Sequence, residues 1–250
     1  LMIIDSHTHI EGLPGCPWLD PPEMILGLIN EADIDKAIVM TYVDAPGTFG
    51  DYDPLKYVQD AFEKYPDRLI GYARLNPLEG DKSKELLREC INERGFMGLK
   101  LHPYGYRSLP EGKATVELIK VAASLNAPTL FHCADEECTL PIQVARAAAA
   151  SPNAAIIMGH MGGYFHVDSA IRMAQKYENI YLETSAMPYP YKIHEAVEAI
   201  GAERVLFASD GPGCDPKLEL FKVKLAKLGR DKEKLVLSGN IIRLLDKVKG

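Results

Sequence analysis

Residues 3–9 read Ile3-Ile4-Asp5-Ser6-His7-Thr8-His9, a short apolar run that ends in two histidines. His7 and His9 lie two positions apart on an extended segment, so their side chains point to the same side of the strand. Because neutral imidazole is a common ligand of divalent metals such as zinc, we predict that both histidines bind a metal. The side chain of Asp5 lies on the same side of the strand as the two histidines. Asp5 either accepts a hydrogen bond that orients an imidazole or has only a structural role in a turn at the strand end.

Four further apolar runs also end in histidine or aspartate. They span residues 99–102, 129–132, 156–160 and 206–210, and they end in His102, His132, His160 and Asp210. The C-terminal ends of parallel strands face one rim of the sheet, so side chains that are distant in the sequence converge there. Histidine and carboxylate are the usual ligands of a divalent metal. The sequence therefore predicts an active site at this rim.

Apolar, β-branched runs alternate with stretches of helical periodicity along the whole chain. The runs predict strands at residues 2–6, 36–42, 69–76, 97–102, 128–132, 155–160, 180–184 and 205–209. Continuously apolar runs indicate burial on both faces, as in a parallel sheet covered by helices. Eight strand–helix units of roughly 30 residues match the ~250 residues of a (β/α)8 barrel. We therefore predict one α/β domain over residues 1–250 with a TIM-barrel fold; the alternative, an open doubly wound sheet, lacks a GxGxxG motif after the first strand.

The composition narrows the class of protein. Acidic side chains outnumber basic ones by 35 to 28, and the net charge of −7 disfavours a sequence-independent grip on nucleic acid. No apolar run approaches the roughly 18 residues that span a bilayer, and no leader-like segment opens the sequence. The five cysteines form no CxxC pair, which is typical of a reducing compartment. We expect a cytoplasmic protein that binds neither nucleic acid nor a membrane.

Several motifs resemble those of the amidohydrolase superfamily and fall in the same order along essentially the whole chain. The motifs are Asp5-Ser6-His7-Thr8-His9, His132, Gly159-His160-Met161-Gly162-Gly163, Ala208-Ser209-Asp210-Gly211-Pro212 and Ser238-Gly239-Asn240. The closer match is the amidohydrolase-related branch, which includes enzymes of the aminocarboxymuconate semialdehyde decarboxylase type. The resemblance implies a distorted TIM barrel whose metal is bound by His7, His9, His132 and Asp210. His160 matches the position that polarises the substrate or assists proton transfer, or that binds a second metal in binuclear relatives.

The chemistry of two further residues bears on the metal centre. Asp210 can bind a metal through one carboxylate oxygen and accept a proton from the attacking water through the other; a helix cap before Pro212 is the alternative. Lys100 decides the number of metals, because fourth-strand lysines of some relatives are carbamylated and bridge two ions. We expect one Zn²⁺, with a second metal as the alternative. Lys100 then pairs with a carboxylate or contacts the substrate.

Other rim residues are candidates for substrate binding. His102 faces the pocket mouth, either as a substrate contact or as hydrogen-bonded support before Pro103. Arg74 either holds an anionic group with its planar fork or forms a structural ion pair. Tyr104 lies on a rim loop, where it lines a specificity pocket or packs within the loop. Together these residues suit a small, often cyclic molecule that carries a carboxylate.

The leading hypothesis is a hydrolase that cleaves a C–N or C–O bond of a small amide, lactone or ester with a metal-activated water. The alternative is a metal-dependent nonoxidative decarboxylase of a small carboxylic acid. A metal-binding barrel without catalysis is a third hypothesis, which the full set of rim residues disfavours. The net charge, with Lys100 and His102 on the fourth strand, disfavours a nuclease of the TatD type. A homodimer is compatible with the resemblance, although no stripe of the sequence marks an interface.

Overall fold

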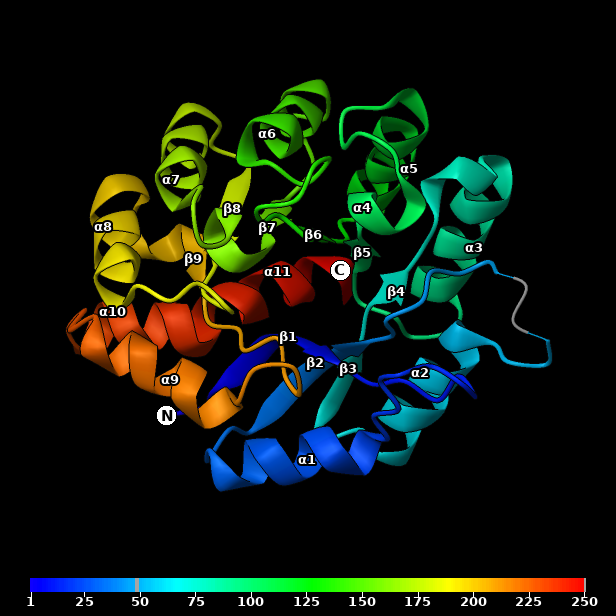
Figure 1. Ribbon diagram of the computed structural model, residues 1–250, viewed down its shortest axis with the longest axis horizontal. Coiled ribbons are helices and arrows are strands. Elements are labelled where there is room, and N and C mark those ends of the chain that lie inside the picture. The colour runs from blue at the N-terminus through cyan, green and yellow to red at the C-terminus, as the bar shows by residue number, and fades with distance from the viewer. Residues whose placement is uncertain (48–49, 250) are drawn as a thin grey trace.

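Parallel strands alternate with helices around a closed barrel in the computed structural model, which describes residues 1–47 and 50–249 (Figure 1). The strands are β1 (Ile4–His9), β2 (Lys36–Met40), β3 (Leu69–Gly71), β4 (Ala73–Arg74), β5 (Leu99–Leu101), β6 (Thr129–Phe131), β7 (Ile156–Met158), β8 (Ile180–Glu183) and β9 (Val205–Leu206). The α-helices are α1 (Pro22–Glu31), α2 (Pro54–Lys64), α3 (Asp81–Asn92), α4 (Pro103–Tyr106), α5 (Lys113–Ser124), α6 (Pro141–Ala150), α7 (Val167–Lys176), α8 (Pro190–Ile200), α9 (Pro216–Leu225), α10 (Arg230–Lys234) and α11 (Asn240–Lys249). Shorter turns of helix are η1 (Pro77–Glu79), η2 (Gly159–Gly162), η3 (Ala202–Arg204) and η4 (Leu235–Gly239). This architecture is the predicted TIM barrel.

The barrel is assembled from two hydrogen-bonded runs of parallel strands. β1, β2 and β3 pair in one run, and β4 to β9 pair in order in the other. The barrel closes because β9 runs beside β1: Ser6 N donates to Phe207 O at 3.1 Å, and Asp210 N donates to His7 O at 2.8 Å. The third expected strand is divided at Tyr72 into β3 and β4, and the division is the visible distortion of the barrel.

Helices begin where the sequence supplies proline and a capping side chain. α1, α2, α6, α8 and α9 each have proline in their first turn. Proline fits there because the first N–H groups of a helix have no partner within the helix. Asp53 accepts hydrogen bonds from Leu55 N and Lys56 N at the start of α2, and Asp215 caps α9 in the same way. Across residues 1–47 and 50–249, no helix has the length and apolar character needed to cross a membrane.

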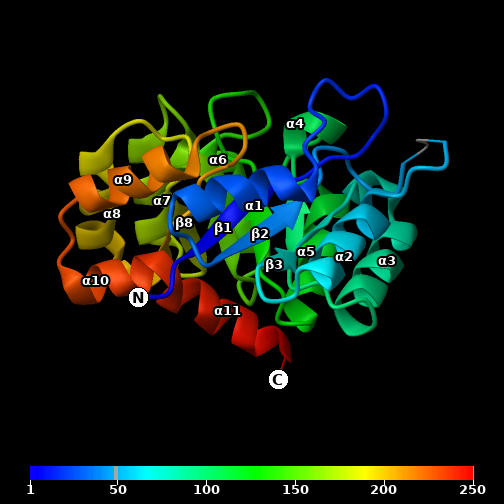
Figure 2. The same ribbon diagram turned by 90° about the horizontal axis from the view of Figure 1, so that it is seen from below.

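The apolar core has two layers. The larger layer lies between the strands and the surrounding helices, and it includes Val39, Phe131 and Leu182. The smaller layer fills the barrel interior and consists of Ile4, Ile38, Met40, Tyr72, Leu130, Ile157 and Leu206, packed against Ile241, Leu244 and Leu245 of α11. Figure 2 shows α11 beneath the barrel, on the side opposite α4. The N-terminal end of the barrel is therefore closed and apolar.

An irregularity in β1 places its two histidines inside the barrel. Ile4 belongs to the inner layer, so strict alternation would point His7 and His9 to the other face. The pairing of β1 with β2 shifts register between Asp5 and Thr8. Such a bulge reverses the alternation of side chains. His7 and His9 therefore share the interior with Ile4, but at the C-terminal end of the barrel.

Candidate metal centre and active site

The five strand-end residues of the sequence motifs converge at the C-terminal end of the barrel. His7 and His9 belong to β1, His132 and Asp210 follow β6 and β9, and His160 lies in η2 directly after β7. His7 Nε2 lies 3.2 Å from His9 Nε2, and Asp210 Oδ1 lies 3.4 and 3.2 Å from these two atoms. His160 Nε2 lies 3.1 Å from His132 Nδ1. Ligand atoms of His7, His160 and Asp210 all lie within 4.8 Å of one another, so the two groups form one centre.

His160 and Asp210 have an uncommon backbone conformation. Their φ angles are 57° and 62°, in the left-handed region that residues other than glycine seldom adopt. Residues held in such conformations cluster at functional sites, where the surrounding structure compensates for the strain. The sharp turns after β7 and β9 therefore agree with a functional role for the two residues, although the same conformation also occurs at ordinary turns such as Asp33 and Asn126.

The two histidines of β1 each donate their outer N–H to an oxygen. His7 Nδ1 lies 3.0 Å from Glu183 Oε1, and His9 Nδ1 lies 3.3 Å from Thr41 O. Carboxylate and carbonyl oxygens only accept hydrogen bonds, so both Nδ1 atoms carry the proton. The lone pairs of both Nε2 atoms then face the centre. Such outer acceptors are the usual partners of metal-binding histidines.

The other two histidines follow the same rule with different partners. His132 Nε2 lies 3.1 Å from Glu136 Oε2, which leaves the Nδ1 lone pair directed inward. His160 Nδ1 lies 2.9 Å from Ser185 Oγ, whose own hydroxyl donates to Glu183 Oε1 at 2.9 Å. Ser185 therefore accepts from His160 Nδ1, and the Nε2 lone pair of His160 faces the centre.

The inner atoms have the spacing that a divalent metal requires. Two lone pairs cannot hydrogen-bond to each other, so the 3.2 Å approach of His7 Nε2 and His9 Nε2 leaves two lone pairs side by side, where a cation would be held. Ligand atoms bound at about 2.0–2.1 Å to a tetrahedral ion lie about 3.3 Å apart. The distances of 3.2 and 3.4 Å from Asp210 Oδ1 to these nitrogens agree with that value. The residues present fit a divalent metal, which the predicted ligand set requires.

Burial and mutual contacts set the charges at the centre. Burial lowers the pKa of His7, His9 and His160, so these imidazoles are neutral at pH 7, the form that binds metals. Burial alone would raise the pKa of Asp210, but its close contacts with His7 and His9 hold that pKa well below its usual range. The centre therefore combines neutral nitrogen donors with one anionic oxygen.

Lys100 is fully buried in the barrel interior and reaches the centre. Its Nζ lies 2.7 Å from His7 Nε2. Burial lowers the pKa of its ammonium group to about 7. Within the part of the chain that the structure describes, the hydrogen-bond partner of Lys100 is an imidazole, and not the carboxylate that the sequence suggested. A single metal and contact of Lys100 with a substrate stay predictions, and a carbamylated Lys100 with a second metal stays the alternative.

Glu183 is a residue of the centre that sequence analysis missed. It accepts from His7 Nδ1 and also from His160 N, at 2.9 Å. The orienting role considered for Asp5 therefore belongs to Glu183, because Asp5 Oδ1 accepts instead from Ser209 N at 2.9 Å and from His7 N at 3.3 Å. The signal was present in the sequence, since Glu183 lies near the end of a predicted strand, as His160 does.

His102 and Tyr104 lie beside the centre rather than in it. His102 Nδ1 accepts from Gly105 N at 3.1 Å and so caps α4, which is the supporting role weighed for it. Its ring also stacks on His132, with 4.2 Å between centroids. Tyr104 is 56% exposed on α4. Substrate binding by His102 and Tyr104 stays a prediction.

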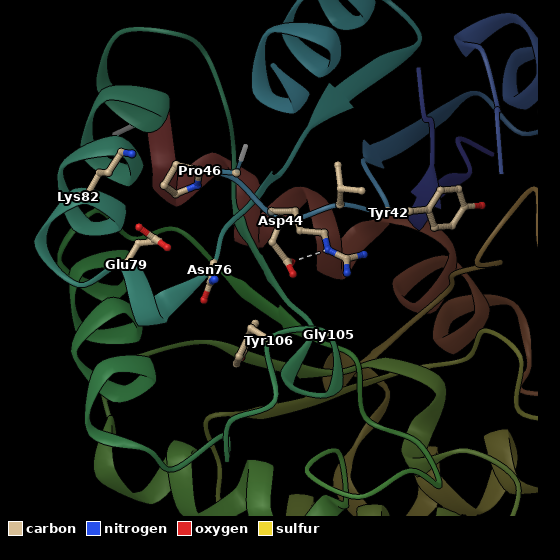
Figure 3. Close-up of a pocket in the computed structure, with 11 residues that line it drawn as sticks. Tyr42, Asp44, Pro46, Asn76, Glu79, Lys82, Gly105 and Tyr106 are labelled. Atoms are coloured by element: carbon tan, nitrogen blue, oxygen red, sulfur yellow. Dashed lines mark hydrogen bonds and ion pairs between the residues drawn. The ribbon is translucent and has the colours of Figure 1, made fainter. Parts of the chain in front are cut away.

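A cavity of about 540 Å³ lies among residues that include Tyr42 and Asp44 (Figure 3). Tyr42 lines it and stacks on His9, with 4.4 Å between ring centroids and 13° between ring planes. Arg74 also lines the cavity. Its Nε donates to Asp44 Oδ1 at 2.7 Å, which is the structural ion pair that sequence analysis considered beside binding of an anionic group. Arg74 Nη1 donates to Thr41 O at 3.3 Å, the carbonyl that also accepts from His9. Two residues of the cavity wall, Tyr42 and Arg74, are therefore joined to His9, the first by ring stacking and the second through Thr41 O.

A closed parallel barrel with convergent metal ligands at its C-terminal rim defines a metal-binding TIM barrel. The sequence model of the amidohydrolase family matches residues 4–247, and the chain belongs to this family. The family predicted from the motifs is thus confirmed, and it supports a divalent metal at the centre. No curated protein matches the sequence.

Solved structures share the fold along the whole chain. 2,6-Dihydroxybenzoate decarboxylase from Rhizobium is 19% identical with a TM-score of 0.75, and the match covers 100% of this chain and 99% of that one. A TIM-barrel protein from Bordetella bronchiseptica is 16% identical with a TM-score of 0.81, covering 100% of both chains. Dihydroxybenzoic acid decarboxylase from Polaromonas, with bound manganese and the inhibitor 2-nitroresorcinol, is 17% identical with a TM-score of 0.75, covering 98% and 97%.

Proposed function

We propose that the protein is a metal-dependent nonoxidative decarboxylase of a small planar carboxylic acid, the alternative that the sequence left beside hydrolysis. The observation that carries the proposal is two ring stacks beside the centre, Tyr42 on His9 and His102 on His132. Flat aromatic faces beside two candidate metal ligands suit an aromatic acid. Two decarboxylases of similar fold act, by their names, on dihydroxybenzoic acids.

Four residues are the proposed metal ligands: His7, His9, His132 and Asp210. When bound, the metal supplies Lewis-acid polarisation of the substrate carboxylate and of a neighbouring oxygen. Three imidazoles and one carboxylate suit zinc, whereas the Polaromonas structure holds manganese. Reconstitution with each ion separately identifies the active form.

His160 is the proposed proton donor. Its Nδ1 proton is held by Ser185 at 2.9 Å, so the Nε2 lone pair faces the centre and takes up the proton that the substrate's hydroxyl gives up there. Burial lowers the pKa of His160, and a proton on Nε2 is therefore readily given up. As the bond between the ring carbon and the carboxylate breaks, its electron pair takes this proton to form a C–H bond. Carbon dioxide leaves.

Carbon dioxide release tests the proposal directly. We expect metal-loaded protein to release carbon dioxide from 2,6-dihydroxybenzoate or related hydroxybenzoates, and to form the corresponding phenol in equal amount. The His7→Ala/His9→Ala double variant serves as the matched control without metal. Acid formation from lactones or amides, with no carbon dioxide from any aromatic acid, would show that the proposal is wrong.

Hydrolysis is the second candidate function, and one observation favours it. The Asp210 side chain is 26% exposed, although Oδ1 faces His7 and His9. A carboxylate that meets both the ligands and solvent can accept a proton from a water molecule. A screen of lactones and cyclic amides in the same assay distinguishes the two functions.

A further inference from the structure

The cavity beside the centre has an outer and an inner end. Figure 3 shows Glu79 and Lys82 at one end and Tyr42 at the other. Glu79 and Lys82 are exposed, whereas Tyr42 stacks on His9, a proposed metal ligand. The inner end of the cavity therefore lies one ring away from a proposed metal ligand, where the far side of a substrate bound at the metal would meet it.

A buried ion pair lines the cavity. Arg74 Nε lies 2.7 Å from Asp44 Oδ1, and the two side chains are 6% and 16% exposed. The pair carries both signs of charge and no net charge. Separating a buried pair leaves an uncompensated charge, which is strongly unfavourable, so the pair persists when a ligand enters. Arg74 thus offers its remaining N–H groups beside an acceptor, rather than a lone positive charge.

We propose that the Arg74–Asp44 pair selects the substituent on the far side of the substrate, favouring a neutral hydroxyl or carboxamide over a second carboxylate. A hydroxyl or carboxamide both donates and accepts hydrogen bonds, which matches the oxygens of Asp44 and the N–H groups of Arg74. A second carboxylate only accepts, and it lies against the carboxylate of Asp44, where like charges repel. The inference rests on the proposed function, because it requires an acid held at the metal centre.

Nitrophenols test the inference without turnover, because a nitro group in place of the reacting carboxylate cannot leave as carbon dioxide. 2-Nitroresorcinol reports binding at the metal centre alone. 2-Nitrophenols that carry a hydroxyl, carboxamide or carboxylate para or meta to the phenol hydroxyl report the selectivity of the cavity. Isothermal titration of protein loaded with Mn²⁺ gives the dissociation constant of each probe.

We expect the hydroxyl or carboxamide probe to bind wild-type protein at least about tenfold more tightly than the carboxylate probe. Asp44→Asn removes the repelling charge, so the carboxylate probe gains about tenfold in affinity while the neutral probes change far less. Asp60→Asn is the matched control, because Asp60 forms an exposed ion pair with Lys56 at 2.7 Å on α2. Its effect on every probe stays within about twofold.

Three outcomes count against these proposals, and they are distinguishable. Equal or tighter binding of the carboxylate probe to wild-type protein overturns the inference, whether or not the Asp44 variant folds. If 2-nitroresorcinol binds but Asp44→Asn leaves the preference among probes unchanged, the inference fails and the proposed function stands. If 2-nitroresorcinol does not bind the metal-loaded protein, the proposed function fails and the inference fails with it.

Discussion

The two ends of the barrel are built on the same strands but bury opposite kinds of side chain. Leu130 and Ile157 pack against α11 at the N-terminal end, whereas His132 and His160 follow on the same strands and face the metal centre. A step of two or three residues thus separates an apolar core from a polar one. The four histidines at the C-terminal end each have an outer oxygen partner, such as Glu183 for His7, as burial of a polar group requires. Stability and chemistry therefore occupy different levels of the same strands.

Removing two ligands at the C-terminal end gives the largest expected effect. His7→Ala/His9→Ala should reduce bound metal from about one ion per chain to nearly none and abolish activity. The fold should persist because the apolar end is untouched. Metal analysis and circular dichroism check both points, with His194→Ala, an exposed residue of α8, as the control. A double variant that keeps its metal would remove both histidines from the ligand set.

His160 separates proton transfer from metal binding. His160→Ala should lower kcat by roughly 10²–10⁴-fold, while metal content stays close to that of the wild type. The alternative, that His160 itself binds the metal, is compatible with the geometry, because its ligand atom lies within 4.8 Å of those of His7 and Asp210. Loss of metal in this variant, measured alongside kcat, would place His160 among the ligands.

A substitution at the apolar end should have the reverse effect. Ile241 of α11 is 1% exposed in the inner layer, so Ile241→Ala should lower the free energy of unfolding by about 2–5 kcal/mol. Metal content and kcat should not change. Ile142→Ala, at a position 43% exposed on α6, is the matched control and should cost far less. Equal losses of stability and metal affinity would show that the two ends are not independent.

Glu183 gives the smallest expected effect. Glu183→Gln replaces an acceptor of His7 Nδ1–H and of His160 N–H with an amide, which accepts more weakly. Metal affinity should fall about 10–100-fold. Competition with a chelator measures the change, and Glu178→Gln at an exposed site is the control. An unchanged metal affinity would mean that the hydrogen bond from His7 to Glu183 does not contribute to metal binding.

The repeated strand–helix units and the polar residues at the strand ends could be predicted from the sequence. Contacts between side chains that are distant in the sequence could not. Strand ends with His132 or Asp210 were predictable because parallel strands place their C-terminal residues at one rim. The Arg74–Asp44 pair joins residues 30 positions apart, and no local pattern reports such a contact. The acceptor of His132 on Glu136 lies in a loop, where periodicity gives no signal. The bulge that turns His7 inward is likewise set by pairing with β2.

The helix across the bottom of the barrel has a kinetic consequence. Because α11 seals the N-terminal end of the barrel, the centre faces the opposite rim in the part of the chain that the structure describes. Under the proposed function, the incoming acid and the departing phenol therefore share that rim. Product must leave before the next molecule enters. The proposed product keeps the ring of the substrate, so under the proposed function the two compete for the free enzyme. Turnover then depends on how quickly a molecule that has already reacted vacates the rim.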